Sequence, residues 1–463
     1  MLRLIFYTLI QIPGGLLMKN QIPSDDPAKN AIGVLDYVKF IIYSTLGVVL
    51  FFIPVTINGT SSIPLDHLIT YLNNTFPLFG STITLVIGVV GGMLPWINGS
   101  FKRNTLNFIL SVLRLLGVPL CIMGFFNWGP AFLMQPNLVP FVWTKVALAV
   151  TVIVVIGSAF LTLIIGYGLL EFTGVLVKKF MRPVYKVPGI AAVNAVTAFI
   201  GSFSVAMFLT DRLYKDARYT YKEAAIVMTG FSTVSATFMI VIAKTAGFMD
   251  IWNFYFWSTF IITLIVSAIS VRLWPFTKLD NSYIDGIGKP EIPLQGNIFK
   301  NAVQEGVSMA ASSRSIFMII WDNLKGGIQM CLVLTPTGTG IAFIVAILLN
   351  MTPVFDYLGY LFYPFTYLLS LFGLPEPTAV AKASAVVLGE VFMPNLSVAA
   401  LTETTRYIIA VVSVSTIVFF AGFIPCLYAT SIRLKPIHVL VIWFERAALS
   451  LLLAGIVALV YFK

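Results

Sequence analysis

The chain has little charge, little histidine and little cysteine. Only 10% of its 463 residues are charged, whereas a soluble domain carries roughly a quarter, so these residues are too few to cover a water-exposed surface. Two histidines, and three cysteines far apart in apolar stretches, exclude a disulfide scaffold and a histidine-based metal site. No phosphate-binding G-x-x-x-x-G-K-[ST] loop and no zinc-protease, kinase or nucleophile-elbow motif is present. We therefore expect no enzyme, no cofactor and no metal site.

Apolar sequence is abundant and makes up 58% of the chain. It falls in blocks of roughly 18–25 residues, and at about 1.5 Å per helical residue such a block crosses a hydrocarbon core about 30 Å thick. The chain is therefore predicted to be an all-α polytopic protein of the lipid bilayer, with about 9–10 transmembrane helices. The strongest predicted spans are Phe40–Ile57, Leu78–Ile97, Leu106–Phe126, Val146–Leu170, Ala224–Ala243, Phe254–Leu273, Gly327–Leu349, Tyr407–Ala429 and Val439–Phe462.

The basic residues indicate how the chain is oriented. They number 29 against 19 acidic residues, a net charge of +10, and they gather between the apolar blocks. Cytoplasmic loops carry such an excess, which favours membrane orientation over nucleic-acid binding. Lys19, Lys29 and Lys39 predict a cytoplasmic N-terminus. We favour Met18 as the true start, because the apolar stretch before it is too short to span; a weak signal-like segment is the alternative.

A first re-entrant hairpin is predicted over Val187 to Thr210, which is rich in Ser, Thr, Asn and Gly. Basic residues flank it on both sides, beginning with Lys186 and Arg212. Both ends should therefore be cytoplasmic, and a single crossing cannot leave both its ends on one side. We expect the segment to enter and return, with its break near Gly201–Ser202. The alternative is an ordinary transmembrane helix with one misplaced basic loop.

A second hairpin is predicted over Thr378 to Ala400. The stretch before it, 350–381, has no Lys or Arg and should be outside, while Arg433 and Lys435 return the chain to the cytoplasm. The number of membrane crossings agrees with these two assignments only if Thr378 to Ala400 is a hairpin entered from outside. Two copies of opposite orientation, each with a broken segment, are typical of an alternating-access carrier with its site at the repeat interface.

The first hairpin offers neutral polar groups. Asn194, Thr197, Ser202 and Ser204 supply donors and acceptors that suit a neutral polar solute or a cation, and we predict that they bind substrate. The alternative is that the hydroxyls bond to their own helix or join neighbouring helices, each worth about 0.6–2 kcal/mol.

The second hairpin offers charge. An ionisable residue at the centre of a membrane costs about 2.5–3.5 kcal/mol on insertion scales, so it normally faces a cavity or a partner. We predict that Glu390 is a ligand or proton-coupling carboxylate and that Lys382 and Asn395 bind substrate beside it. The alternative places Glu390 at a wet tip or in a structural ion pair with Lys382. Glu445 and Arg446, near the cytoplasmic start of the last span, are expected to reach back to the surface.

The run LLEFTGVLVKKFMRPVYKVPGIAAVNAVTAFIGS, at 169–202, with its continuation at 209–238, resembles the YjiH family of bacterial membrane proteins. Residues 51–69 resemble the same family. Its members contain the nucleoside-recognition gate domain, which also occurs in concentrative nucleoside transporters, ferrous-iron transporters and spore-maturation proteins. The resemblance implies a helical, carrier-like fold in a bacterial inner membrane, with a second, divergent gate copy over Asn301 to Phe462.

Together these features predict a secondary transporter for a small polar solute. A nucleoside is one candidate, and an amino acid or a dipeptide is another. Na⁺ or H⁺ could supply the coupling gradient, and a homo-oligomer is a possible assembly. The alternative is a non-transporting scaffold or regulator built on the gate fold. The predicted parts are an N-terminal cytoplasmic segment (1–38), N-terminal transmembrane helices (39–145), a first gate-like repeat (146–275), a cytoplasmic linker (276–300) and a second, inverted gate-like repeat (301–463).

Overall fold

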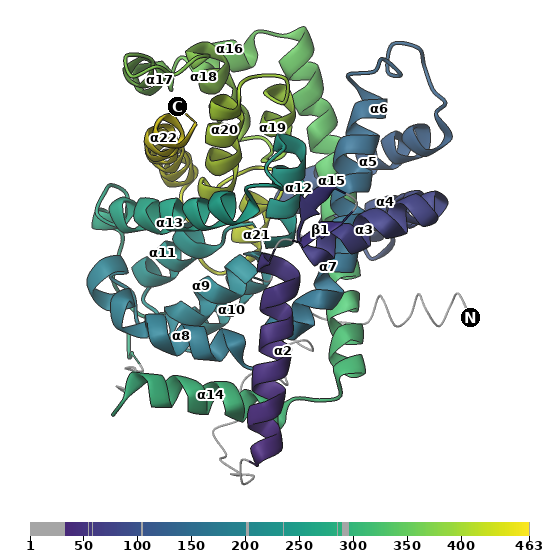
Figure 1. The fold of residues 1–463 in the computed structure, drawn as a ribbon. Helices are drawn as coiled ribbons and strands as arrows, with labels where there is room; N and C mark the ends of the chain where they lie inside the picture. Colours follow the sequence, from purple (N-terminus) through teal and green to yellow (C-terminus); the bar gives the residue numbers. More distant parts are fainter. Residues whose placement is uncertain are drawn as a thin grey trace.

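The fold is helical (Figure 1). The structure, a computed structural model, describes residues 33–53, 55–57, 59–102, 105–200, 203–234, 236–284, 286–288 and 296–462. Within them, 7 helices are long and apolar enough to cross a membrane. The predicted all-α, polytopic membrane fold is confirmed. Met18 lies outside the described residues.

The N-terminal part and one long central helix pack together. The elements of this part are α2 (Val34–Phe52), β1 (Val55–Ile57), β2 (Thr60–Ser62), α3 (Pro64–Thr75), α4 (Pro77–Ile97), a 3-10 turn (Ser100–Lys102), α5 (Thr105–Phe126), α6 (Val139–Phe141), a π-helical turn (Val142–Leu148) and α7 (Ala149–Ile165). The strands form an antiparallel pair. The central helix, α15 (Ile316–Met351), has 36 residues, about 54 Å, and packs against α4, α5 and α7.

Glycines allow these helices to approach closely. A Cβ atom on Gly91 of α4 would lie 2.0 Å from the carbonyl oxygen of Leu332 in α15, and one on Gly117 of α5 would lie 2.2 Å from that of Pro336. Small residues at crossings are how membrane helices gain packing contacts, because lipid offers no hydrophobic drive for association.

The rest of the chain forms two series of helices, one before and one after α14 (Ile298–Ser312) and α15. The first series is α8 (Leu169–Phe180), a π-helical turn (Met181–Tyr185), α9 (Ala191–Ile200), α10 (Phe203–Lys215), α11 (Tyr221–Phe231), α12 (Ala236–Ala246), α13 (Trp252–Ser270) and a 3-10 turn (Phe276–Lys278). After α14 and α15, the second series is α16 (Val354–Gly359), α17 (Tyr363–Ser370), α18 (Pro377–Val386), α19 (Met393–Ser397), α20 (Glu403–Ser415), α21 (Phe423–Ala429) and α22 (Pro436–Tyr461).

Each series contains a hairpin of short helices. In the first, α9 packs against α10, and in the second, α18 packs against α19. The 10 residues of α9 span about 15 Å, half the hydrocarbon core, so neither arm crosses alone. In Figure 1 the first hairpin lies in the lower half of the molecule and the second in the upper half. A pair of packed short helices lies where each hairpin is predicted, although the break at Gly201–Ser202 lies outside the described residues, and their re-entrant course stays a prediction.

Two of the nine predicted spans are interrupted. The span predicted at Ala224–Ala243 is two helices, α11 and α12, and the span predicted at Tyr407–Ala429 is also two, α20 and α21. Apolar composition predicts burial at membrane depth but not whether the helix continues through it. Each interruption leaves carbonyl groups without helical partners, and the candidate site forms around them.

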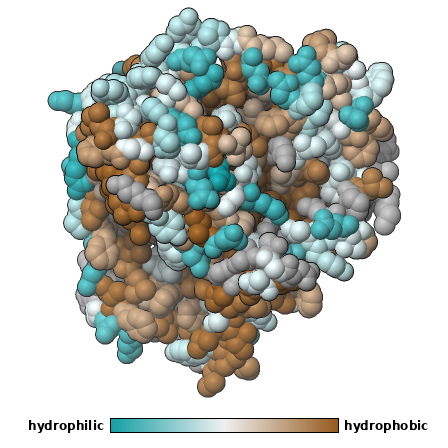
Figure 2. Space-filling view, turned by 45° about the horizontal axis from the view of Figure 1, so that its top comes forward, coloured by the Kyte–Doolittle hydropathy of each residue, from teal (hydrophilic) through white to brown (hydrophobic). Residues whose placement is uncertain are grey.

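The surface carries large apolar side chains, as a lipid-facing surface should. Figure 2 shows broad brown areas broken by teal patches. On the helices of the N-terminal part, Leu78 and Ile97 are exposed at the two ends of α4, and Phe108 and Phe126 at those of α5.

Candidate functional site

The tip of the second hairpin is bonded to the segment that separates α20 from α21. The amide of Phe420 donates to the carbonyl of Leu388 at 2.8 Å, and the amide of Ala421 donates to that of Gly389 at 3.1 Å. Non-helical backbone at membrane depth is stable only where protein or water satisfies its polar groups. Here the amides of one non-helical segment pair with the carbonyls of the other.

The interruption after α20 has a strained backbone. Ile417 has a φ of 67°, a left-handed conformation that is unusual for a β-branched residue and costs about 1–3 kcal/mol. The amide of Val418 donates to the carbonyl of Thr416 at 2.7 Å and closes a three-residue turn around Ile417. Such strain persists only where the surroundings hold it, so the break is a built feature of the fold.

The other interruption meets this one. At the end of α11 the amide of Thr233 donates to the carbonyl of Phe231 at 2.8 Å, another three-residue turn. The hydroxyl of Thr233 donates to the carbonyl of Val414, in the last turn of α20, at 3.2 Å. The ends of the two interrupted helices are therefore in contact through Thr233.

The first hairpin reaches the same place. Phe203, the first residue of α10, packs edge-on against Phe419 with ring centres 5.9 Å apart. The side-chain amide of Asn194 donates to the hydroxyl of Thr210 at 3.0 Å and so joins the two arms. Both hairpins and both interruptions thus converge on residues 414–421.

Glu390 is buried at the tip of the second hairpin, with 5% of its surface exposed. Its Oε2 accepts from the amides of Phe392 and Met393, each at 2.7 Å, at the start of α19. These amides belong to the orphan donors of a helix N-terminus, where a carboxylate is favoured by both hydrogen bonds and dipole. Glu390 therefore holds the tip in shape whatever else it binds.

Two buried amides have an unpaired oxygen. Asn194 and Asn395 are each 1% exposed, and the Oδ1 atom of each has no hydrogen-bond partner among the described residues. The nitrogen of Asn395 donates to the carbonyl of Val391 at 3.0 Å and to the hydroxyl of Ser413 at 3.1 Å. A buried acceptor left unpaired costs about 1–3 kcal/mol. One such acceptor on each hairpin suits a ligand that donates hydrogen bonds, or a cation.

The other predicted site residues have mixed placements. Lys382 lies on α18 and pairs with Asp356 of α16 at 2.8 Å, so the structure does not form the alternative ion pair between Lys382 and Glu390. Thr197 lies in α9 and Ser204 in α10, but their side chains are outside what the structure describes, as is Ser202 altogether. Their predicted contacts with substrate stay predictions.

Arg446 is the residue that sequence reasoning misplaced. It does not reach the surface but is 1% exposed, because α22 packs against α13 and α20 and turns this face inward. Its guanidinium donates to the carbonyls of Ser415 at 2.8 Å and Thr416 at 3.1 Å. The proline at the start of α22, Pro436, was the available signal, since it puts Arg446 nearly three turns inside the helix.

The outer end of the second hairpin is tied to α20. Glu376 precedes α18 and accepts from the hydroxyls of Thr402 and Thr405. Burial opposes the charge of Glu376, but these hydrogen bonds outweigh it and hold the pKa of the carboxyl below its usual 4.5.

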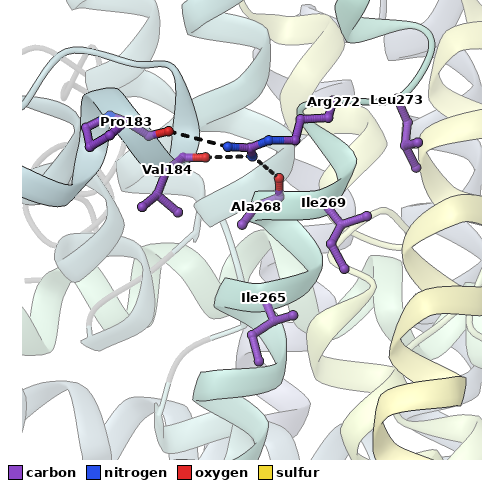
Figure 3. A pocket seen from close by; sticks show the side chains of 7 residues that line it. All are labelled: Pro183, Val184, Ile265, Ala268, Ile269, Arg272 and Leu273. Carbon is purple, nitrogen blue, oxygen red and sulfur yellow. Dashed lines mark hydrogen bonds between the residues drawn. The ribbon is translucent and has the colours of Figure 1, made fainter.

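Two hollows lie away from the convergence of the hairpins. One, of about 430 Å³, is lined by Ile265 and other residues of α13 and by the turn after α8. Figure 3 shows Arg272 there, bonded to the carbonyls of Pro183, Val184 and Ala268. The other, of about 310 Å³, lies between the loop before α18, the start of α20 and the end of α22. Glu390 lines neither of these two hollows.

Comparison with known proteins gives two relatives in bacteria. An uncharacterized protein of Alkalihalophilus pseudofirmus is 27% identical over 444 residues, which cover 92% of this chain and 94% of that protein. The sporulation integral membrane protein YlbJ of Bacillus subtilis is 31% identical over 88 residues, 19% of this chain and 21% of that protein.

Among solved structures, the transporter CNTnw in an inward-facing, substrate-bound state superposes with a TM-score of 0.42 at 16% identity, covering 100% of this chain and 96% of that one. A CNTnw variant in an outward-facing state gives a TM-score of 0.43 at 13% identity, covering 99% and 96%. Residues 147–249 match the Gate family, described as nucleoside recognition. This match agrees with the gate domain expected from the sequence: the matched stretch runs from just before α7 to just past α12 and includes the first hairpin and the first interrupted helix.

Proposed function

We propose that this protein is a secondary transporter that moves a small polar solute through the site where the two hairpins meet. Nucleosides are the first solutes to test, because the Gate match over 147–249 is described as nucleoside recognition. The proposed location is the bacterial cell membrane, with the N-terminus in the cytoplasm, since the basic residues concentrate in the loops assigned to that side.

One observation carries this proposal: the tip at Leu388–Gly389 is hydrogen-bonded to the break between α20 and α21, rather than to a continuous helix. Discontinuous helices that meet near the middle of the bilayer are where secondary carriers bind solute and coupling ion. Alternating access then needs only that one hairpin separates from the break while the other stays closed.

The groups at the site suit a solute with several hydrogen-bond donors. The unpaired amide oxygens of Asn194 and Asn395 can accept from N–H or O–H groups, and a nucleoside offers both from its base and its ribose. Glu390 adds a carboxylate that can accept from a hydroxyl or take up a proton. Small-molecule sites generally use a few polar groups of this kind to orient the ligand.

The test begins with purified protein in thermal-shift measurements against nucleosides, bases, amino acids, dipeptides and Na⁺. A specific ligand stabilises the folded state by mass action, by about 2.7 kcal/mol at 100 times its Kd. The solute found is then followed into proteoliposomes under an imposed H⁺ or Na⁺ gradient.

Glu390→Gln separates the two roles of this residue. The glutamine oxygen can still accept from the amides of Phe392 and Met393, so we expect nearly wild-type thermal stability, whereas loss of the charge should reduce flux at least about tenfold. Glu390→Ala also loses the cap and should lower stability by about 1–3 kcal/mol. Flux that is unchanged in the glutamine variant contradicts the role of Glu390. If no solute gives either flux or stabilisation, the result favours the alternative of a scaffold or regulator.

A further inference from the structure

Arg446 is a buried charge without an anionic partner. Its side chain is 1% exposed, and no carboxylate forms an ion pair with it in the part of the chain that the structure describes. Removing a cation from water costs several kcal/mol unless its surroundings replace the lost hydration. The groups that replace the hydration of the guanidinium therefore indicate the role of Arg446.

Those groups are two carbonyls at the end of α20 and the hydroxyl of Ser267 in α13, which lies beside the last turn of α11 and also within 2.8 Å of the carbonyl of Thr263 in its own helix. The Nε and Nη2 atoms donate to the carbonyls of Thr416 and Ser415 at the end of α20. Nη1 donates to the hydroxyl of Ser267 at 3.1 Å, and that hydroxyl lies 2.5 Å from the carbonyl oxygen of Gly230, in the last turn of α11. Helix C-termini carry about half a negative charge and leave their last carbonyls unpaired.

Carriers with discontinuous helices use such C-terminal ends and unwound carbonyls to coordinate their coupling cation. We propose that Arg446 is a tethered cation that fills this place permanently, so that no dissociable Na⁺ binds between α11 and α20. Its positive charge also holds the strained turn at Ile417, because it binds the two carbonyls immediately before it. This deepens the proposed function, on which its consequence rests: solute flux should not need Na⁺ at this site.

The primary test is chemical rescue of thermal stability, which requires no solute. Arg446→Ala in detergent should melt several degrees below wild type, and low millimolar guanidinium, far below denaturing concentrations, should restore part of the loss. Choline at the same ionic strength should not. Arg433→Ala, at an exposed arginine, is the matched control and should respond to neither. A folded Arg446→Ala protein that melts like wild type, or that choline restores equally, overturns the proposal.

Two further variants keep the test informative if the alanine variant does not fold. Arg446→Lys keeps the charge but cannot fork to both carbonyls, whereas Arg446→Gln keeps donors without charge. A tethered cation requires the lysine variant to be the more stable of the two. Equal or greater stability of the glutamine variant shows that hydrogen bonding alone matters and overturns the proposal.

Flux separates this inference from the proposed function. Wild-type proteoliposomes should move solute equally with Na⁺ or choline outside, and flux that requires Na⁺ overturns the tethered-cation role. If no solute moves but guanidinium rescues the alanine variant, the transport proposal fails while the role of Arg446 stands. If solute moves without Na⁺ but guanidinium does not rescue the alanine variant, the transport proposal stands while the proposed role of Arg446 fails.

Discussion

At the scale of single residues, the hairpins use side chains to do what helical backbone cannot. Glu390 caps α19, Asn194 joins the arms of the first hairpin, and Arg446 binds the carbonyls that α20 leaves open. Glu390 and Arg446 pair with backbone groups that are left open where a helix begins or ends, whereas Asn194 pairs with the hydroxyl of Thr210. The unpaired oxygens of Asn194 and Asn395 differ from these groups, because each lowers the stability of the fold and makes no hydrogen bond among the described residues.

This contrast gives a prediction for Asn395→Leu, a substitution of similar size. The variant loses two donated hydrogen bonds but also removes a buried unpaired acceptor, so the free energy of unfolding should change by less than about 2 kcal/mol. Stabilisation by the solute should disappear. Asn350→Leu, at the exposed end of α15, is the control and should retain it. Undiminished solute-induced stabilisation in the Asn395 variant, measured by thermal shift, means that its oxygen does not face the ligand.

At the scale of elements, the fold separates a tightly packed scaffold from the hairpins. The scaffold is α4, α5, α7 and α15, where helix backbones meet at glycines. Within α15 the need for glycine depends on position. A Cβ atom on Gly340 would lie 2.3 Å from the carbonyl oxygen of Leu113, whereas one on Gly338 would have no atom within 4 Å. The second hairpin is held by hydrogen bonds at its tip and at its outer end, which the proposed transport cycle would exchange.

We therefore predict that Gly340→Ala lowers the free energy of unfolding by about 1–3 kcal/mol, because α5 must move away from α15. Gly338→Ala, two residues away on the same helix, should leave stability unchanged or slightly higher, since alanine favours helix. Thermal denaturation in detergent compares the two. Equal effects would show that the crossing is looser than the close approach at Leu113 indicates.

At the scale of the whole molecule, the hairpin of the first series (α9 and α10) lies in the lower half and that of the second (α18 and α19) in the upper half (Figure 1). The first is flanked by basic residues and the second is preceded by a stretch without them. If the loop charges set the orientation of the protein in the bilayer, the first hairpin begins and ends on one side of the membrane and the second begins and ends on the other. This arrangement gives one shared site with two possible entrances.

Cysteine accessibility tests this arrangement. In a background with Cys121, Cys331 and Cys426 replaced by alanine, Lys186→Cys and Arg212→Cys should both react from the cytoplasmic side with a membrane-impermeant maleimide. Phe372→Cys and Glu403→Cys, at the outer ends of the second hairpin, should both react from outside. Labelling of positions 186 and 212 from different sides contradicts the first hairpin as a re-entrant segment.

The sequence alone determined the membrane environment, the positions of the apolar helices and the two hairpins. These follow from composition and from the charges beside each segment, because the bilayer imposes the same length and polarity on every crossing. The same reasoning singled out Glu390 and Asn395 as polar residues within an apolar segment, and the structure buries both; their role in binding stays a prediction.

Only the tertiary structure decided which groups meet. It interrupted two predicted spans, paired Lys382 with Asp356, and turned Arg446 inward to the end of α20 and to Ser267 of α13. Hydropathy describes each residue against lipid or water, whereas a side chain finds its partner only when helices distant in the sequence pack together. The fate of a buried charge is set by those partners, and for Arg446 they come from residues 31, 30 and 179 positions away.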